Sequence, residues 1–270
     1  MSEQVYDLSE GWNSLAAEML YACVEQLPAA ELAFYARRIR ANGGPALDQA
    51  CGTGRHLFAL LERGLVVHGA DISADALRLA QREAVQRRVP VTLYQQRMEA
   101  CDLPTRYGTI YVANGTFQIL ADRAVALATL RRFREHLLPG GQLLLEVGVP
   151  PEVTQGAAVH DAAHPMVWDP EPRRGAAGAI VTTLWSEDVD LFRQTLLSKR
   201  RYDLYVDGRL VRSETHAHVL TWFCYHEMVG LLERAGYKEI TTYGDWSDEP
   251  ATQASQTVVY GARQGAARTP

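Results

Sequence analysis

Hydrophobic residues in the first half of the chain alternate between the short runs typical of buried strands and the spacing typical of amphipathic helices. The strand-like runs are residues 46–48, 65–70, 91–94, 109–113 and 142–147. Helical spacing separates them, most clearly at residues 55–63, after Ser73 and at residues 122–138. Parallel strands need crossover connections, so this alternation predicts a mostly parallel sheet with helices on both faces.

The pattern changes after residue 150. Residues 151–178 are rich in Pro, Gly and Ala, and the runs that follow have strand character. Asp207-Gly208 separates two of these runs, and such a pair between strands predicts a hairpin. The predicted strands are residues 180–185, 195–206 and 209–222, followed by a helix that ends at Gly236 and by strands at residues 237–243 and 257–263. The sequence thus predicts an α/β fold with a doubly wound, mostly parallel seven-stranded sheet and an inserted antiparallel β patch.

These patterns suggest four parts. Residues 12–25 and 28–41 have helical spacing, and the first of these helices belongs to the N-terminal part. We expect a helical cap at residues 1–27, a ligand-binding α/β domain at residues 28–150 and 223–263, an insertion at residues 151–222 and a flexible tail at residues 264–270.

Composition narrows the classes of function. Hydrophobic residues make up 47% of the chain and the formal net charge is −5, so a broad basic surface for nucleic acid is not expected. The four cysteines are scattered, and neither a secretory signal nor an apolar stretch of membrane-spanning length is visible. We expect a cytoplasmic protein that binds neither nucleic acid nor membrane.

The first strand leads into a glycine-containing turn that can bind a ligand. In parallel sheets, ligands bind at the carboxyl ends of the strands, and Gly52 and Gly54 let the backbone approach a ligand closely. A dinucleotide-binding turn continues to a third glycine, whereas this chain has Leu57 in that place. A nicotinamide oxidoreductase is therefore the less favoured interpretation.

Two acidic residues end the first two strands. Asp48 precedes the glycine turn, and Asp71 is placed where a carboxylate can accept hydrogen bonds from both hydroxyls of a ribose. Ser73 follows closely, so Asp71 could instead belong to a helix cap. Ile72 could pack against an adenine ring.

Several motifs together resemble class I methyltransferases that use S-adenosylmethionine. They are LDQACGTGR at residues 47–55, HGADIS at 68–73, Arg97-Met98, YVANGTFQIL at 111–120 and LLPGGQLLLEV at 137–147. The overall pattern is also similar to the glycine, sarcosine and amino-sugar N-methyltransferases, which likewise carry an N-terminal Tyr-Asp pair, here Tyr6-Asp7, and an antiparallel insertion. The resemblance implies that residues 5–25 fold over the cofactor and that the insertion forms the acceptor pocket or a dimer face.

The resemblance also implies a set of cofactor-binding residues. Two positions depart from the family pattern: Ala50 replaces a glycine, and Arg97 replaces an acid that binds the adenine amino group. Because Arg97 cannot accept a hydrogen bond, backbone groups, Glu99 or a further group elsewhere in the chain must take that role. The implied cofactor contacts are Asp48, Ala50, Gly52, Thr53, Gly54, Asp71, Ile72, Met98, Asn114 and Gly115.

Candidate acceptor-site residues come from the N-terminal part and the insertion. We expect Tyr6, Trp12, His216 and Trp222 to take part in catalysis, since aromatic faces attract cations and a histidine can serve as a base. Packing within the insertion is an equally good interpretation for each aromatic residue. The further base candidates are His160, His164 and His218; their spacing resembles metal sites, but Asp161 and Pro165 disfavour zinc, and no metal is expected.

The sequence therefore predicts methyl transfer from S-adenosylmethionine to a nitrogen of a small-molecule amine, in bacterial natural-product metabolism. Among the possible acceptor atoms, nitrogen ranks first, the carbon of an electron-rich aromatic such as an indole ranks second, and oxygen ranks third. A non-catalytic partner subunit that binds the cofactor is a separate alternative. A homodimer is possible on this pattern.

Overall fold

The computed structural model describes residues 4–7, 11–22, 27–150, 153, 166–167, 173–174 and 178–264. A central seven-stranded sheet has the order β12-β13-β6-β5-β2-β3-β4. Its strands from β2 to β6 pair in parallel, whereas β13 is antiparallel to both of its neighbours. This confirms the predicted fold class. The strands are β2 (Ala46–Gln49), β3 (Val67–Asp71), β4 (Thr92–Gln95), β5 (Tyr107–Val112), β6 (Leu137–Glu146), β12 (Lys238–Gly244) and β13 (Val258–Arg263).

Helices cover both faces of this sheet. Phe34 of α2 and Leu57 of α3 pack in the hydrophobic core on one face, and Leu130 of α5 and Leu232 of α7 pack in the core on the other. The near-continuous burial of β5 follows from this double cover. The helices are α2 (Ala29–Asn42), α3 (Arg55–Leu61), α4 (Ala74–Arg87), α5 (Arg123–Glu135) and α7 (Tyr225–Arg234), with short 3₁₀ turns η2 (Met98–Ala100) and η3 (Thr116–Ile119).

Local chemistry sets the helix boundaries. The Ser73 hydroxyl accepts a hydrogen bond from the Ala76 amide at 3.0 Å, and Asp122 caps α5 in the same way. The predicted extension of α5 to Leu138 is wrong, because α5 ends at Glu135 and Leu137 already pairs with Tyr107 at the start of β6. Strand pairing therefore ends the helix before the Pro-Gly-Gly sequence that suggested the boundary.

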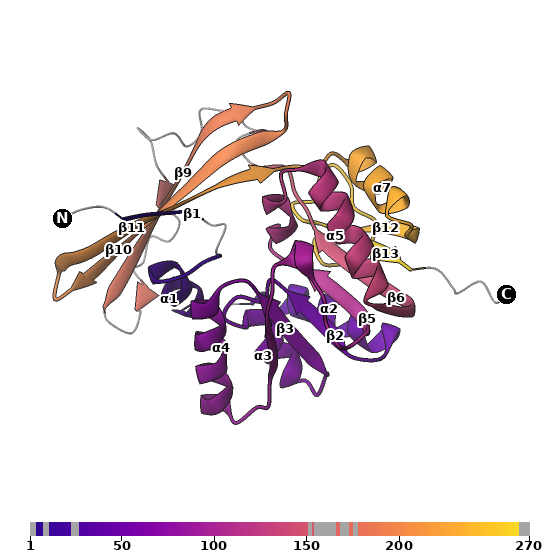
Figure 1. The fold of residues 1–270 in the computed structure, drawn as a ribbon, viewed down its shortest axis with the longest axis horizontal. Coiled ribbons are helices and arrows are strands. Elements are labelled where there is room, and N and C mark those ends of the chain that lie inside the picture. Colours follow the sequence, from indigo (N-terminus) through magenta and orange to yellow (C-terminus); the bar gives the residue numbers. More distant parts are fainter. Residues whose placement is uncertain are drawn as a thin grey trace.

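A second sheet lies beside the α/β unit (Figure 1). β10 pairs with β11 in the predicted hairpin around Asp207-Gly208, and β9 pairs antiparallel to β10. An N-terminal strand, which hydrophobic periodicity did not predict, pairs in parallel with β11. The strands are β1 (Gln4–Asp7), β7 (Met166–Val167), β8 (Arg173–Arg174), β9 (Ala179–Asp190), β10 (Thr195–Val206) and β11 (Arg209–Thr221).

Helix α1 (Leu15–Ala22) joins the two sheets. Leu15 and Met19 pack against Tyr202 of the second sheet, whereas Ala17 packs against Leu79 of α4. Figure 1 shows α1 lying between the long strands and α4. Among the described helices, none is both long and apolar enough to cross a membrane.

The residues just before α1 are fixed from both sides. On the α/β side, the Ser73 hydroxyl donates to the Trp12 carbonyl oxygen at 2.8 Å, and the Ser14 amide donates to Asp75 at 2.9 Å. On the other side, Glu214 of β11 accepts hydrogen bonds from the Ser14 hydroxyl at 2.8 Å and the Leu15 amide at 3.1 Å. Residues 11–15, which we call the bridging segment, thereby connect the two sheets.

Glu214 is fully buried, and its charge is compensated within the structure. Arg212 forms an ion pair with it, and the His216 Nε2 atom lies 3.5 Å from it. Burial opposes ionisation of Glu214, but the hydrogen bonds from His216, Ser14 and the Leu15 amide together lower its pKa. The carboxylate is therefore the ionised acceptor that holds the bridging segment.

We predict that Glu214→Gln lowers the free energy of unfolding by about 2 kcal/mol, because an amide replaces an ionised acceptor of several buried donors. Urea unfolding measures this change, and hydrogen exchange of the α1 amides is expected to become faster. The control is Glu239→Gln, which changes an exposed ion pair with Arg263 and is expected to cost less than about 0.5 kcal/mol. Equal effects of the two substitutions would contradict the role of Glu214.

Candidate functional site

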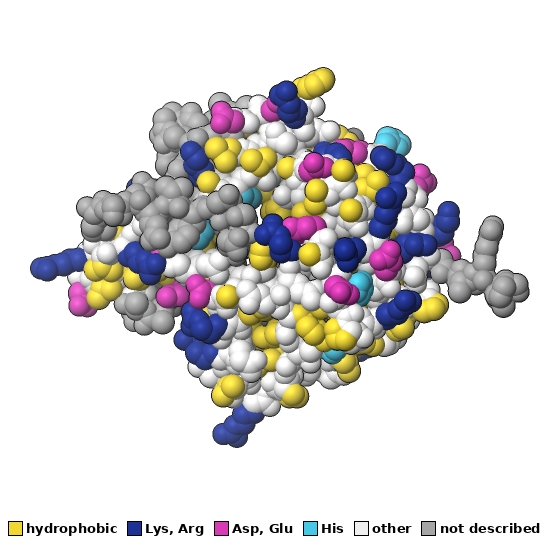
Figure 2. Space-filling model, viewed as in Figure 1, with side chains coloured by type: hydrophobic (Ala, Val, Ile, Leu, Met, Phe, Trp, Pro, Cys, Tyr) yellow, Lys and Arg dark blue, Asp and Glu magenta, His cyan; other side chains and the backbone are white. Residues whose placement is uncertain are grey.

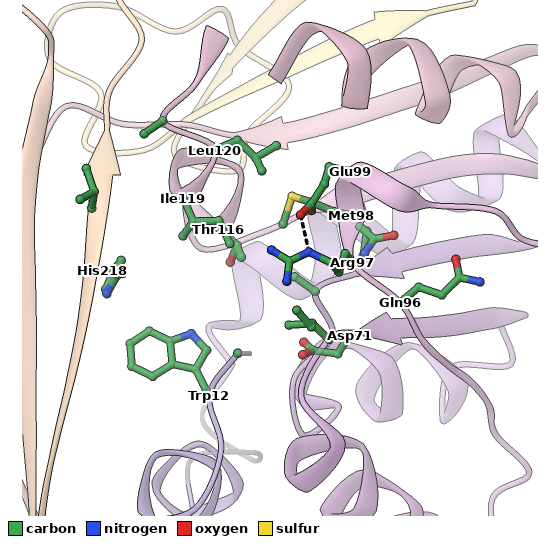
Figure 3. A pocket seen from close by; sticks show the side chains of 16 residues that line it. Trp12, Asp71, Gln96, Arg97, Met98, Glu99, Thr116, Ile119, Leu120 and His218 are labelled. Carbon is green, nitrogen blue, oxygen red and sulfur yellow. Dashed lines mark hydrogen bonds and ion pairs between the residues drawn. The ribbon is translucent and has the colours of Figure 1, made fainter. Parts of the chain in front are cut away.

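A cavity of about 310 Å³ lies between the carboxyl ends of the central strands and β11 of the second sheet. Figure 3 shows Asp71, Arg97 and Met98 on one side of it and Trp12 and His218 on the opposite side. Its position at the strand ends is where parallel α/β sheets bind ligands. The lining residues are Gly11, Trp12, Gln49, Ala50, Asp71, Ile72, Gln96, Arg97, Met98, Glu99, Thr116, Ile119, Leu120, Ala121, His218 and Val219.

The turn after β2 has the left-handed backbone that its glycines suggested. Gly52 has a φ of 55° and Gly54 a φ of 92°. A Cβ atom on Gly54 would lie 2.5 Å from the Phe58 ring, whereas one on Gly52 would find only a Leu20 methyl group at 3.9 Å. Gly54 thus permits close packing of α3, and Gly52 leaves open space beside the turn.

Asp71 shapes the turn from the end of β3. Its two carboxylate oxygens accept hydrogen bonds from the Gly52 amide at 2.7 Å and the Ser73 amide at 2.8 Å. Burial raises the pKa of Asp71, and these backbone hydrogen bonds act in the opposite direction. Each oxygen has a second lone pair, so the carboxylate at the cavity wall can still accept hydrogen bonds from a ligand.

Asp48 lies deeper than Asp71 and is not part of the cavity lining. Burial raises its pKa to about 6, and nearby His56 and Tyr111 partly offset this effect. His56 itself contacts the buried Glu31 at 2.7 Å. The Asp48 carboxyl therefore belongs to a buried polar cluster behind the turn, and the adjacent Gln49 and Ala50 are the residues that reach the cavity.

An ion pair crosses the end of the cavity beside Met98. The Arg97 Nε atom donates to a Glu99 oxygen at 2.5 Å (Figure 3). The 3₁₀ turn η2 brings Glu99 round to the cavity, so an acid is present although position 97 holds arginine. Buried Met98 and partly buried Ile72 supply apolar walls at this end.

Aromatic rings form the opposite end of the cavity. The Trp12 ring stacks on His216 with centroids 6.1 Å apart and meets the His218 ring edge-on at 5.5 Å. His216 is fully buried and contacts Glu214, whereas His218 lines the cavity. Burial, followed by the nearby Arg200 charge, lowers the pKa of His218 to about 3, so its imidazole is neutral.

The structure brings together only part of the predicted site. Trp12, Ala50, Asp71, Ile72 and Met98 line one cavity. Trp222 is 4% exposed and lies outside the lining, and Tyr6 belongs to β1 but its side chain is not described. His160 and His164 lie outside the described residues. The other predicted residues outside the lining are Asp48, Gly52, Thr53, Gly54, Asn114, Gly115 and His216.

Several lining residues were missed by the sequence analysis. Ile119, Leu120 and Val219 are apolar residues, and nothing in their spacing separates a cavity wall from a core position. Gln118 explains how they meet: its side-chain amide donates to the carbonyl oxygens of Gly148 and Thr221, at 3.0 and 2.8 Å. This contact joins η3 to the end of β11 and closes the cavity wall.

The residues present fit S-adenosylmethionine. A buried carboxylate at the end of β3, apolar walls from Ile72 and Met98, and open space beside Gly52 match a nucleoside with an extended side chain. Within the described residues, no group of three His, Cys, Asp or Glu side chains could hold a metal ion. The arrangement thus provides a ligand site next to a separate aromatic end.

Comparison with known proteins agrees with this geometry. Residues 46–141 match a family model described as a methyltransferase domain. The chain is 35% identical to a dTDP-3-amino-3,6-dideoxy-α-D-glucopyranose N,N-dimethyltransferase of Streptomyces fradiae, over 44% of this chain and only 45% of that protein. It is 25% identical to the cypemycin N-terminal methyltransferase of a Streptomyces species, over 81% of this chain and 82% of that protein.

Solved structures show the same fold. An S-adenosylmethionine-dependent methyltransferase from Clostridium acetobutylicum is similar with a TM-score of 0.75 and 13% identity, over 92% of this chain and 97% of that one. A sugar N-methyltransferase from Streptoalloteichus is similar with a TM-score of 0.71 and 21% identity, over 92% of both chains. Residues 46–141 thus match a methyltransferase domain, and the chain has the fold of methyltransferases that use S-adenosylmethionine.

Ala50 has a φ of 65°, the left-handed conformation that glycine adopts without strain. We predict that Ala50→Gly raises the free energy of unfolding by about 0.5–1 kcal/mol, because removing the Cβ strain outweighs the greater entropy of glycine in the unfolded chain. Urea or thermal unfolding measures the change. Ala113→Gly is the control: Ala113 is buried but has no positive φ, so its substitution is expected to destabilise the protein. Loss of stability in both variants would contradict strain at Ala50.

Proposed function

We propose that the protein transfers a methyl group from S-adenosylmethionine to a nitrogen atom of a small-molecule amine. The observation that carries this proposal is one cavity with acidic and apolar residues suited to the cofactor at one end and neutral aromatic residues at the other. The relatives named above methylate an amino sugar and a peptide N-terminus according to their names, which supports nitrogen as the acceptor atom. Their origin in Streptomyces also supports a place in bacterial natural-product metabolism.

The roles of the cofactor-end residues follow from their positions. Asp71 would accept hydrogen bonds from the ribose hydroxyls, and the Gly52 and Ser73 amides hold its carboxylate in place. Ile72 and Met98 line the cavity and would enclose the adenine ring. Asp48 acts on the methionine end through the turn that it supports, since its carboxyl lies behind Gln49 and Ala50 rather than in the cavity wall.

The cofactor supplies an electrophilic methyl group on a positively charged sulfur. A neutral amine attacks such a carbon without a strong base, so positioning supplies most of the catalysis. Trp12 and His218 lie at the acceptor end, and a hydrogen bond from the Ser73 hydroxyl to the Trp12 carbonyl oxygen holds the segment that carries Trp12. With its pKa near 3, His218 cannot retain a proton near neutral pH, and the proton of the methylated amine leaves to solvent.

The first experiment is calorimetric titration with S-adenosylhomocysteine. We expect Asp71→Asn to weaken binding by roughly tenfold to a hundredfold, since a neutral amide replaces the carboxylate acceptor. Asp102→Asn, the same change at an exposed residue outside the cavity, is expected to bind like wild type. Thermal unfolding verifies that both variants fold. Equal affinity in Asp71→Asn and wild type would contradict the assigned role of Asp71.

Methyl transfer to amines is then measured with labelled S-adenosylmethionine, and products methylated only on oxygen or carbon would overturn the proposal.

A second experiment tests Glu99 as the acceptor for the adenine amino group. S-inosylhomocysteine carries an oxygen in place of that amino group, so wild type is expected to prefer S-adenosylhomocysteine by about tenfold. Glu99→Ala is expected to bring the ratio of the two dissociation constants close to one. Because both ligands bind the same variant, a general loss of stability does not alter the ratio. An unchanged ratio would assign adenine recognition to other groups.

A further inference from the structure

The charged side chains that line the cavity all lie at one of its ends. The charged residues that line it are Asp71, Arg97 and Glu99, and all three lie on the cofactor side in Figure 3. Arg97 is paired with Glu99 at 2.5 Å, so the charge of the one lining cation is already compensated by a carboxylate. The described lining therefore presents no compensating charge to an anionic acceptor.

At the acceptor end, the described lining residues carry no charged side chain; the Arg200 guanidinium lies 4.9 Å from the Trp12 ring centroid but does not line the cavity. Trp12 presents its ring, and His218 presents an imidazole whose pKa is lowered by burial and then by Arg200, so that it is uncharged. Among the described residues, the Trp12 ring, the Arg200 guanidinium and His216 lie near His218, and none of these three is a carboxylate. A flat, neutral group can pack against such rings without leaving a buried charge unpaired.

The mouth of the cavity continues this apolar character. Val219 is 47% exposed and Ile119 is 38% exposed, although both also line the cavity. Exposed apolar side chains around a cavity are suited to bury an apolar part of a ligand. Elsewhere on the visible face, Lys and Arg side chains are intermixed with Asp and Glu (Figure 2).

We propose that the acceptor is a primary or secondary amine carried on an apolar body with a ring and without phosphate. This inference rests on the proposed function and narrows it. Recognition of a phosphate or diphosphate relies on arginine, lysine or exposed helix amides directed at its oxygens. The acceptor end instead offers Trp12, His218 and Val219.

The reaction balances without a further reactant. The nitrogen lone pair forms the new bond to the methyl carbon, and the bond from that carbon to sulfur breaks with its electron pair remaining on sulfur. The positive charge passes from sulfur to nitrogen, and the amine then loses one proton to water. A neutral surrounding such as that of Trp12 and His218 also favours the unprotonated amine that must attack.

The test uses tyramine and O-phosphotyramine, which share an amine and a ring and differ by one phosphate. Each is titrated into the complex of the protein with S-adenosylhomocysteine, and methyl transfer is measured in parallel with labelled S-adenosylmethionine. Tyramine is expected to bind at least roughly tenfold more tightly, because the phosphate would lose solvation without gaining a cation.

Two exposed valines of β11 provide a matched pair of variants. Val219 lines the cavity and is 47% exposed, whereas Val211 is 48% exposed and lies outside the lining. Val219→Ser is expected to raise KM for tyramine by roughly fivefold with little change in kcat, because it removes apolar contact area. Val211→Ser is expected to match wild type.

The outcomes separate this inference from the proposed function. Three results would overturn the inference that the acceptor is an apolar amine without phosphate. They are equal or tighter binding of O-phosphotyramine, binding of neither compound, and equal effects of the two valine variants. If S-adenosylhomocysteine fails to bind wild type, the proposed function fails as well. Binding of S-adenosylhomocysteine together with N-methylation of phosphorylated amines alone would leave the proposed function intact and reject only the inference.

Discussion

The buried contacts of Glu214 are the interaction on which the site depends. One carboxylate on β11 holds Ser14 and Leu15, while Ser73 and Asp75 at the start of α4 hold the other side of the same segment. The bridging segment therefore fixes the second sheet relative to the central one. Among the described strands no pairing links the two sheets, so the positions of Trp12 and His218 relative to Asp71 depend on side-chain connections such as this one.

A second connection closes the cavity from the opposite side. Gln118 bonds to the carbonyl oxygens of Gly148 and Thr221, and Arg123 bonds to the Thr221 hydroxyl at 2.8 Å and to Glu227 at 2.6 Å. The end of β11 is thereby attached to η3 and to α5. One attachment on each side of the cavity gives the inserted sheet a defined orientation. A single flexible hinge would leave that orientation free to vary.

The electrostatics of the cavity follow from this arrangement. The central sheet supplies the acids and the Arg97–Glu99 pair from the ends and following turns of its strands, where exposed backbone amides can compensate charge. The second sheet supplies rings from the face of a strand, where His218 is neutral and His216 is buried against Glu214. A charged cofactor end and a neutral acceptor end are therefore consequences of joining two different kinds of sheet.

The sequence by itself determined the order of the strands and helices of the central sheet, the Asp207-Gly208 hairpin and the glycine-containing turn near Asp71, because local periodicity and turn chemistry encode them. The tertiary structure alone decided that Trp12 reaches the cavity and Trp222 does not, and that β1 joins the second sheet. These features depend on contacts between residues far apart in the chain, such as Ser14 with Glu214. Periodicity shows which face of an element is apolar, but it does not show which other element covers that face.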